Sequence, residues 1–337
     1  MAVIIRGNAN KDVWNEWSDQ LEAAILDADA NRNNDDELVK ALANVKGSKR
    51  FAEKATTIES LGDFMAKTEG ADAVEDTFEE GYDSLIQHIS FSKTVILSRE
   101  LADDGNVDMM KARATNMVKA YKRSRAKYLT QLLTTSVGST TTMSWGTQTG
   151  INIAAPDGQA IFSAAHPLKA VTGVTECNLY SNGFGTTDDV LNELANKMRN
   201  FRDDKGNVLG LLADTVVIPG NAPALEKAVK AVIGSDGEIG TNNNDINTQR
   251  GKWKLVVDYL WTPTFTTNAP FIIMSSEANK DLLGTMFYDH VALDIAQEVK
   301  TESRNLVYNG YSRWSAGTNN WRHVIMGGSA DASAQSL

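Results

Sequence analysis

From Leu85 to Ser98 the sequence alternates between apolar and polar side chains for longer than strands in compact domains usually run. A period of two indicates a β-strand with one buried and one exposed face. At about 3.3 Å per residue, about 14 residues extend roughly 46 Å. We therefore predict a hairpin strand that projects beyond its own domain. One face of it comprises Leu85, Ile89, Phe91, Val95 and Leu97, and the other His88, Ser90, Ser92, Thr94 and Ser98.

An acidic segment, Thr68 to Asp83, precedes this strand and contains no lysine or arginine. The whole chain has a net charge of −10, which disfavours a protein whose main task is to bind nucleic acid. Residues 1–108 contain 11 Lys/Arg and 23 Asp/Glu, whereas the remainder contains 22 and 20. Either the acidic segment is a solvated face, or it meets a basic element of a neighbouring copy. Its carboxylates are Glu69, Asp72, Glu75, Asp76, Glu79, Glu80 and Asp83.

A long basic helix is predicted after the strand. Asp103–Asn106 reads as a turn in which Asn106 suits the N-cap, and the apolar spacing becomes helical from Val107 to Leu133. Such a helix is about 40 Å long. A row of cations on a helix is usually a solvated face, but this one can also receive the acidic segment of a neighbour. The basic row comprises Lys111, Arg113, Lys119, Lys122, Arg123, Arg125 and Lys127.

Residues 1–55 are predicted to form a helical arm. Val13, Trp14, Trp17, Leu21 and Ile25 recur at intervals of three and four, and a second stripe follows at Leu38, Leu42 and Val45. A terminal segment has few neighbours in its own chain. We therefore expect Trp14 and Trp17 to pack against another subunit.

Beyond residue 138 the pattern predicts mixed helices and strands after a Ser/Thr/Gly-rich loop at Gly138–Gly150. Helices are predicted at 188–201 and 223–233, and strands at 213–218, 252–260 and 271–274. A closing hairpin is predicted from strands at 305–313 and 320–326, with its turn at 316–319.

The sequence offers little support for catalysis or metal binding. The segment from Asp27 begins like a calcium-binding loop, but the required glycine is Arg32 and the required glutamate is Leu38. Ser163 and His166 suggest a nucleophile and its base, although the neighbouring proline favours a loop histidine. The single cysteine excludes an internal disulfide, and no apolar run has the ~20 residues that span a bilayer. We expect no cofactor, no metal and no membrane contact, and synthesis in the cytoplasm.

Several stretches resemble the major capsid proteins of tailed bacteriophages, which have the Hong Kong 97-like fold. Ile96–Asp104 is similar to the phrase with which that family's E-loop rejoins the body. Asp157–Pro167, with Phe162-Ser163 and His166-Pro167, resembles a phrase of the Mu-like major head subunits. Val216–Pro219 followed by Leu225–Ala228 looks like the entry to the family's axial domain.

The resemblance implies an α+β Hong Kong 97-like fold with five segments. Residues 1–55 would be the N-terminal arm and 56–104 the extended E-loop hairpin. Residues 105–205 would be the peripheral domain with its spine helix at 107–133, and 206–300 the axial domain. Residues 301–337 would return to the peripheral domain and end in the C-terminal tail.

The resemblance also implies a structural function rather than catalysis. The chain would assemble with itself into hexamers and pentamers of an icosahedral shell around double-stranded DNA, contacted non-specifically. Expected partners are a separate scaffolding protein, a portal and a decoration protein, with assembly in the host bacterial cytoplasm and a final place in the virion capsid. The acidic segment is expected near the basic row of a neighbour. The alternatives are an encapsulin-type compartment shell and an α/β enzyme.

Overall fold

The structure is a computed structural model in which the chain forms two compact units. Unit 1 comprises Met1–Glu53, Ile86–Leu129 and Phe287–Ala316, and unit 2 comprises Lys54–Leu85, Thr130–Met286 and Gly317–Leu337. Each unit therefore combines three separate stretches of sequence. The structure describes residues 4–6, 14–31, 33–58, 64–70, 72, 75, 80–104, 106–185, 187–237, 246–266 and 268–337, with side chains except at 4–6, 14–18, 57, 58, 80 and 107.

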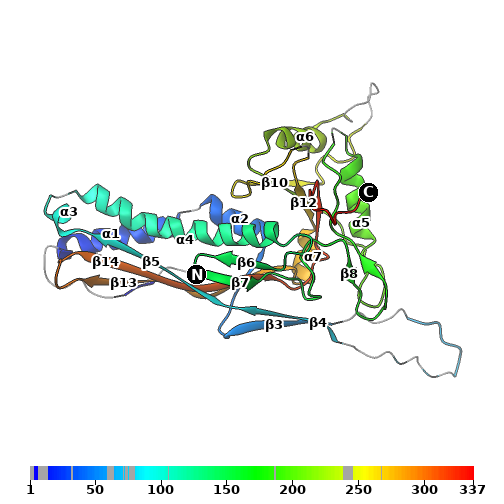
Figure 1. Cartoon of the computed structure of the whole chain (residues 1–337), viewed down its shortest axis with the longest axis horizontal. Helices are drawn as coiled ribbons and strands as arrows, with labels where there is room; N and C mark the ends of the chain where they lie inside the picture. The colour runs from blue at the N-terminus through cyan, green and yellow to red at the C-terminus, as the bar shows by residue number, and fades with distance from the viewer. Residues whose placement is uncertain are drawn as a thin grey trace. The chain divides into compact units, whose positions relative to one another are not determined.

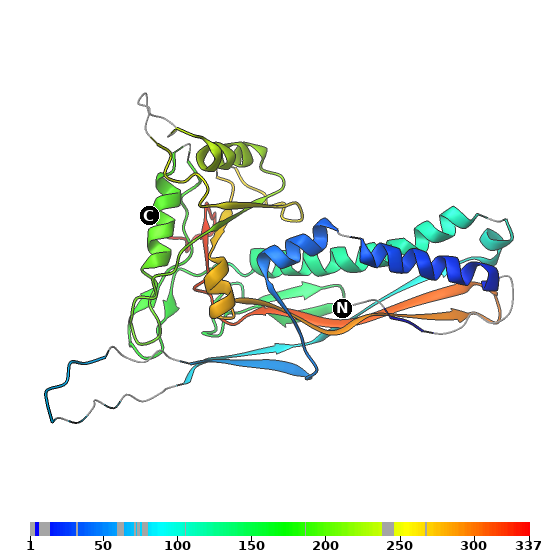
Figure 2. The same ribbon diagram turned by 180° about the vertical axis from the view of Figure 1, so that it is seen from behind.

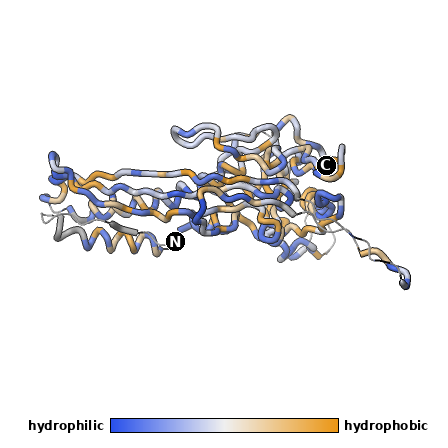
Figure 3. The backbone as a smooth tube through the Cα atoms, turned by 90° about the horizontal axis from the view of Figure 1, so that it is seen from below, coloured by the Kyte–Doolittle hydropathy of each residue, from blue (hydrophilic) through white to orange (hydrophobic). Residues whose placement is uncertain are grey.

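Unit 1 is built on a sheet with the strand order β1-β13-β14-β5, and β2 also pairs with β13. β5 runs antiparallel to β14, from Leu97 opposite Leu306 to Ile89 opposite Trp314. Hydrophobic and hydrophilic residues are interspersed along the long strands of this sheet (Figure 3). The strands are β1 (Ile4–Arg6), β2 (Asn44–Gly47), β5 (Ile89–Leu97), β13 (Thr285–Val299) and β14 (Leu306–Thr318).

Helices α1 (Trp14–Ala30), α2 (Asn34–Leu42) and α4 (Val107–Thr135) lie on one face of this sheet (Figures 1 and 2). A short helix, α3 (Arg99–Asp103), links β5 to α4. Apolar side chains from both layers form one core, which comprises Leu21, Ile25, Leu97, Ala102, Met110, Ala114, Met117, Val118, Leu293, Ile295, Leu306 and Tyr308. The helix predicted from Val107 is thus confirmed, and the Asn106 side chain accepts a hydrogen bond from the Met109 amide at 3.4 Å, as an N-cap should.

The single long strand predicted from Leu85 to Ser98 is wrong, because it divides at His88. β4 (Glu80–Gln87) pairs with β3 (Ala52–Ile58), whereas β5 pairs with β14. The buried face changes at the same point. Ile86 and His88 are buried and Leu85 is 66% exposed, whereas in β5 the less exposed positions are Ile89, Phe91, Val95 and Leu97. A change of partner strand across one non-strand residue reverses the phase of the alternation.

Unit 2 is built on a second sheet with the order β11-β10-β12-β15. β10 (Thr215–Pro219) is buried throughout and runs parallel to β11 (Lys254–Asp258) and antiparallel to β12 (Phe271–Met274). Its core joins this sheet to α5 (Asp189–Arg199) and α6 (Pro223–Gly234). The remaining elements are β6 (Thr142–Trp145), β7 (Gln148–Asn152), β8 (His166–Pro167), β9 (Thr175–Glu176), α7 (Ser276–Asp281) and β15 (Val324–Gly327).

Three other predictions fail. The expected closing hairpin does not exist, because β14 continues through the supposed turn to Thr318 and β15 pairs with β12 instead. Residues 316–319 are buried, so their side chains serve packing rather than a turn.

The expected loop at Gly138–Gly150 contains the β6–β7 hairpin. Val45 lies in β2 and is 42% exposed, so it does not extend a helical stripe.

Candidate functional site

The acidic segment presents several carboxylates to solvent. Glu69, Asp72 and Glu75 are exposed. Asp83 has partners within the chain, since its carboxylate lies 2.9 Å from the Lys54 ammonium and accepts a hydrogen bond from the Thr56 hydroxyl at 2.6 Å. These bonds, led by that to Lys54, lower the pKa of Asp83. Asp76, Glu79 and the side chain of Glu80 lie outside the described part of the chain.

The basic row divides into exposed and internal members. Arg113, Lys119, Arg123 and Lys127 are exposed on α4, and Lys111 is half-buried. Because Lys119, Arg123 and Lys127 are spaced four residues apart, they share one face of the helix. Lys122 and Arg125, by contrast, project into unit 1.

The Lys122 ammonium lies beside the segment from Asp27, whose sequence begins like a calcium-binding loop. Its Nζ donates to the carbonyl oxygen of Asp29 at 2.7 Å and lies 3.1 Å from the Asp36 carboxylate. A further carbonyl contact, to Asn31, measures 3.2 Å. The side chain is 5% exposed, so the lysine fills this ring of oxygens and ties the connection between α1 and α2 to α4.

Arg125 forms the second internal ion pair of the basic row. Its Nη2 lies 2.8 and 2.7 Å from the two carboxylate oxygens of Asp289 on β13, and the guanidinium packs over the Phe287 ring. Burial raises the pKa of Asp289, and Arg125 opposes that rise. This pair connects α4 to β13, so its function is structural.

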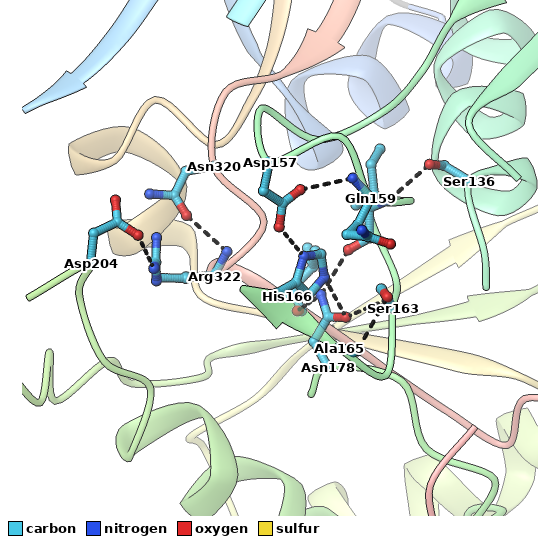
Figure 4. Close-up of polar contacts among 12 residues, drawn as sticks. Ser136, Asp157, Gln159, Ser163, Ala165, His166, Asn178, Asp204, Asn320 and Arg322 are labelled. Carbon is cyan, nitrogen blue, oxygen red and sulfur yellow. Dashed lines mark hydrogen bonds and ion pairs between the residues drawn. The ribbon is translucent and has the colours of Figure 1, made fainter. Parts of the chain in front are cut away.

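The His-Pro phrase of the sequence folds into a buried polar cluster in unit 2 (Figure 4). His166 is fully buried, and its Nδ1 lies 2.6 Å from the Asp157 carboxylate. Its Nε2 lies 3.2 Å from Oδ1 of Asn178, and its ring stacks on Trp321 with centroids 3.9 Å apart. The expected loop histidine is therefore an interior residue of the β8–β9 hairpin.

Asn178 fixes the geometry of this cluster. Its Nδ2 donates to the carbonyl oxygens of Ile161 and Val324, at 2.8 and 3.2 Å. Its Oδ1 accepts from the Ser163 amide at 2.8 Å, so the amide orientation is unambiguous. Both nitrogens of His166 are engaged with Asp157 and Asn178, and neither is left to activate the Ser163 hydroxyl. The arrangement excludes the nucleophile–base pair considered from the sequence.

An adjacent ion pair in Figure 4 joins Arg322 to Asp204, with Nη2 2.8 Å from Oδ1. Nε of Arg322 donates to the carbonyl oxygen of Arg202 at 2.6 Å. Both side chains are 7% exposed. Like the His166 cluster, this pair connects distant segments of unit 2.

The described residues contain no group of three or more His, Cys, Asp and Glu side chains placed to hold a metal ion. Within the same residues, no helix combines the length and apolarity that crossing a membrane requires. The side chains of Trp14 and Trp17 are not described, so their expected packing stays a prediction.

Comparison with known proteins gives the family. The family model described as "Phage capsid protein" matches residues 79–326. A search of curated proteins finds no match.

Solved structures agree in fold. A structure titled Mycobacterium phage Patience has a TM-score of 0.55 at 12% identity, covering 100% of this chain and 95% of that one. The capsid of Ralstonia phage GP4 has a TM-score of 0.55 at 13% identity, covering 85% and 86%. The capsid of an empty GTA particle has a TM-score of 0.54 at 12% identity, covering 88% and 90%. The chain therefore belongs to the phage capsid protein family and is a tailed-phage major capsid protein with the Hong Kong 97-like fold, a structural subunit of an icosahedral shell.

Proposed function

We propose that hexamers and pentamers of this chain close the head of a tailed phage around double-stranded DNA. The observation that carries the proposal is the family match over residues 79–326, supported by the fold likeness to phage capsids. A scaffolding protein, a portal and assembly in the host cytoplasm belong to the same proposal. The proposal also includes the division into five segments, with boundaries at 55, 104, 205 and 300, and a structural function without catalysis. An acidic shell also suits a DNA container, because a basic lining would retain the DNA.

Within this shell, the acidic segment of one subunit contacts the exposed face of α4 on a neighbour. The exposed carboxylates Glu69, Asp72 and Glu75 supply the negative side of the contact. Lys119 and Arg123 supply the positive side. They border a depression of about 520 Å³ between α1 and α4, whose α1 wall contains Ala24 and Ala28. Lys122 and Arg125 are excluded from this contact because their charges are paired inside unit 1.

Charge reversal tests the contact. We expect Glu69→Lys/Asp72→Lys/Glu75→Lys to reduce the yield of closed particles, measured by electron microscopy and sedimentation of the full chain. Lys119→Glu/Arg123→Glu should reduce it similarly, and the combined variant should recover most of it. Lys252→Glu, which reverses an exposed charge in unit 2, is the matched control. A combined variant that assembles no better than either parent contradicts the pairing.

The encapsulin alternative is separated by the contents of the particle. The family model that matches is that of phage capsid proteins, which favours the phage assignment. Particles purified from an infected or induced host should contain double-stranded DNA that resists added nuclease. Particles that contain protein cargo and no nucleic acid would support the compartment shell instead.

A further inference from the structure

Two histidine rings stack inside unit 1 where β4 ends and β5 begins. His88 occupies that junction and is 4% exposed, and its ring centroid lies 5.0 Å from that of His290 on β13, with planes 13° apart. Tyr288, also on β13, contacts the His88 ring edge-on. The other charged groups that act on this pair are Glu53 of β3 and Arg313 of β14. Arg50, 3.9 Å from the Glu53 carboxylate, is largely exposed.

A chain of hydrogen bonds defines the protons on these rings. The Ser48 hydroxyl donates to the Glu53 carboxylate at 2.6 Å, so its oxygen accepts from Nε2 of His88 at 2.9 Å. Nδ1 of His88 lies 2.9 Å from the Ser315 hydroxyl on β14 and, in the neutral ring, accepts from it. Nδ1 of His290 faces the Ser48 carbonyl oxygen at 3.2 Å and must be the donor. The neutral form of His88 therefore satisfies every group in the chain.

A second proton on His88 disrupts this order. Nδ1 becomes a donor, so the Ser315 hydroxyl, which is 1% exposed, must turn its own proton toward a new acceptor. The added positive charge lies beside His290 and near Arg313, and among the described residues Glu53 opposes it. Burial, followed by His290 and Arg313, lowers the pKa of His88 below its ordinary value of 6.5.

We propose that the His88–His290 pair is a pH-sensitive switch, which holds the start of β3 and the end of β4 against β13 and β14 when neutral and releases them in acid. The pKa of His88 is lower in the folded protein than in the unfolded chain. The contact therefore contributes its full stability above about pH 6.5 and loses it as the pH falls through the folded pKa.

The switch stands independently of the proposed contact between acidic segment and α4, because all of its groups belong to one unit of one chain. Charge reversal at Glu69 or Lys119 does not touch it. Conversely, a failure of the switch leaves the proposed function as it was.

Hydrogen–deuterium exchange of assembled full-length protein tests the switch. Peptides covering 44–56 and 81–97 are followed at about pH 7.5 and about pH 5, with labelling times corrected for the intrinsic exchange rate. We expect a loss of protection in acid, since a proton taken up on opening raises the opening constant as the pH falls. The variant His88→Gln/His290→Asn keeps donors toward Ser48 but cannot titrate, so its protection should be independent of pH.

Two results would overturn the proposal: a wild-type chain without the acid response, or a double variant that retains it. If the double variant fails to assemble, His88→Gln alone decides the matter. Loss of this ring, which titrates differently in the folded and unfolded chain, should then flatten the slope of log protection against pH. An unchanged slope rejects the pair as the switch.

Discussion

Asn178 is the residue on which the unit 2 polar cluster depends. Its side chain forms hydrogen bonds to the stretch Ile161–His166 and to Val324. His166 in turn contacts Asp157. The sequence indicated Phe162-Ser163 and His166-Pro167 as a motif but gave no sign of Asn178. Nothing local marks an asparagine whose partners are brought together by the fold. His88 and His290 were missed for the same reason, since their spacing in sequence carries no signal.

Replacing Asn178 should be costly. Asn178→Ala removes the hydrogen bonds to two buried carbonyl oxygens, a buried amide and a histidine nitrogen. Each unsatisfied group costs about 1–3 kcal/mol, with partial relaxation, so we expect the free energy of unfolding to fall by roughly 2–4 kcal/mol. Urea unfolding measures this. Asn116→Ala, at an exposed position of α4, should change it by less than about 0.5 kcal/mol.

His323 should make unit 2 sensitive to acid. It is fully buried, and burial lowers its pKa to about 4, while the hydrogen bond from Nδ1 to the Asn320 carbonyl opposes the shift. The folded pKa lies below the ordinary 6.5, so stability should be complete above pH 6.5 and decline as the pH falls toward about 4. Melting temperatures across this range measure the decline. His323→Asn keeps a donor for the Asn320 carbonyl and should flatten the dependence of melting temperature on pH. If the variant and the wild type show the same dependence, another group causes the acid sensitivity.

At the scale of elements, the local patterns were reliable where a helix or strand has one partner surface. The helix from Val107 and the strand at Phe271–Met274 are as predicted, because each turns one uninterrupted apolar pattern to the core. The long strand failed at His88, where the partner changes. β13 was not predicted, because Asp289, His290 and Asp294 interrupt its apolar pattern. Asp289 is tolerated there because Arg125 arrives from α4, a contact that no local pattern reveals.

The arm helices should depend on one lysine of α4. Lys122→Met removes the ammonium that binds Asp29, Asn31 and Asp36. Removing one partner of a buried pair costs about 3–5 kcal/mol, and the partial exposure of the two carboxylates reduces this to roughly 1–3 kcal/mol. We expect faster hydrogen exchange across 14–42. Lys119→Met, three residues earlier and exposed, is the control, and equal exchange in both variants would deny Lys122 its anchoring role.

At the scale of the whole molecule, the shell depends on many weak contacts between copies. An exposed ion pair contributes about 0–1 kcal/mol and is screened by salt. If the acidic segment is part of each contact, raising the salt concentration from about 0.05 M to about 1 M should lower the resistance of particles to denaturant. Glu69→Gln/Asp72→Asn/Glu75→Gln should lose most of this salt dependence. Light scattering during denaturant titration measures both, and identical salt curves would place the acidic segment outside the contacts.

The interleaving of the two units has a consequence for the timing of synthesis. Strand β14 lies between β13 and β5 in the unit 1 sheet, yet it is translated long after β5 ends at Leu97. β15, which completes the unit 2 sheet, comes later still. Neither unit can therefore finish folding on the ribosome until its last strand has been synthesised. A chain that terminates before Leu306 lacks the strand that joins β13 to β5, so it cannot complete the unit 1 sheet.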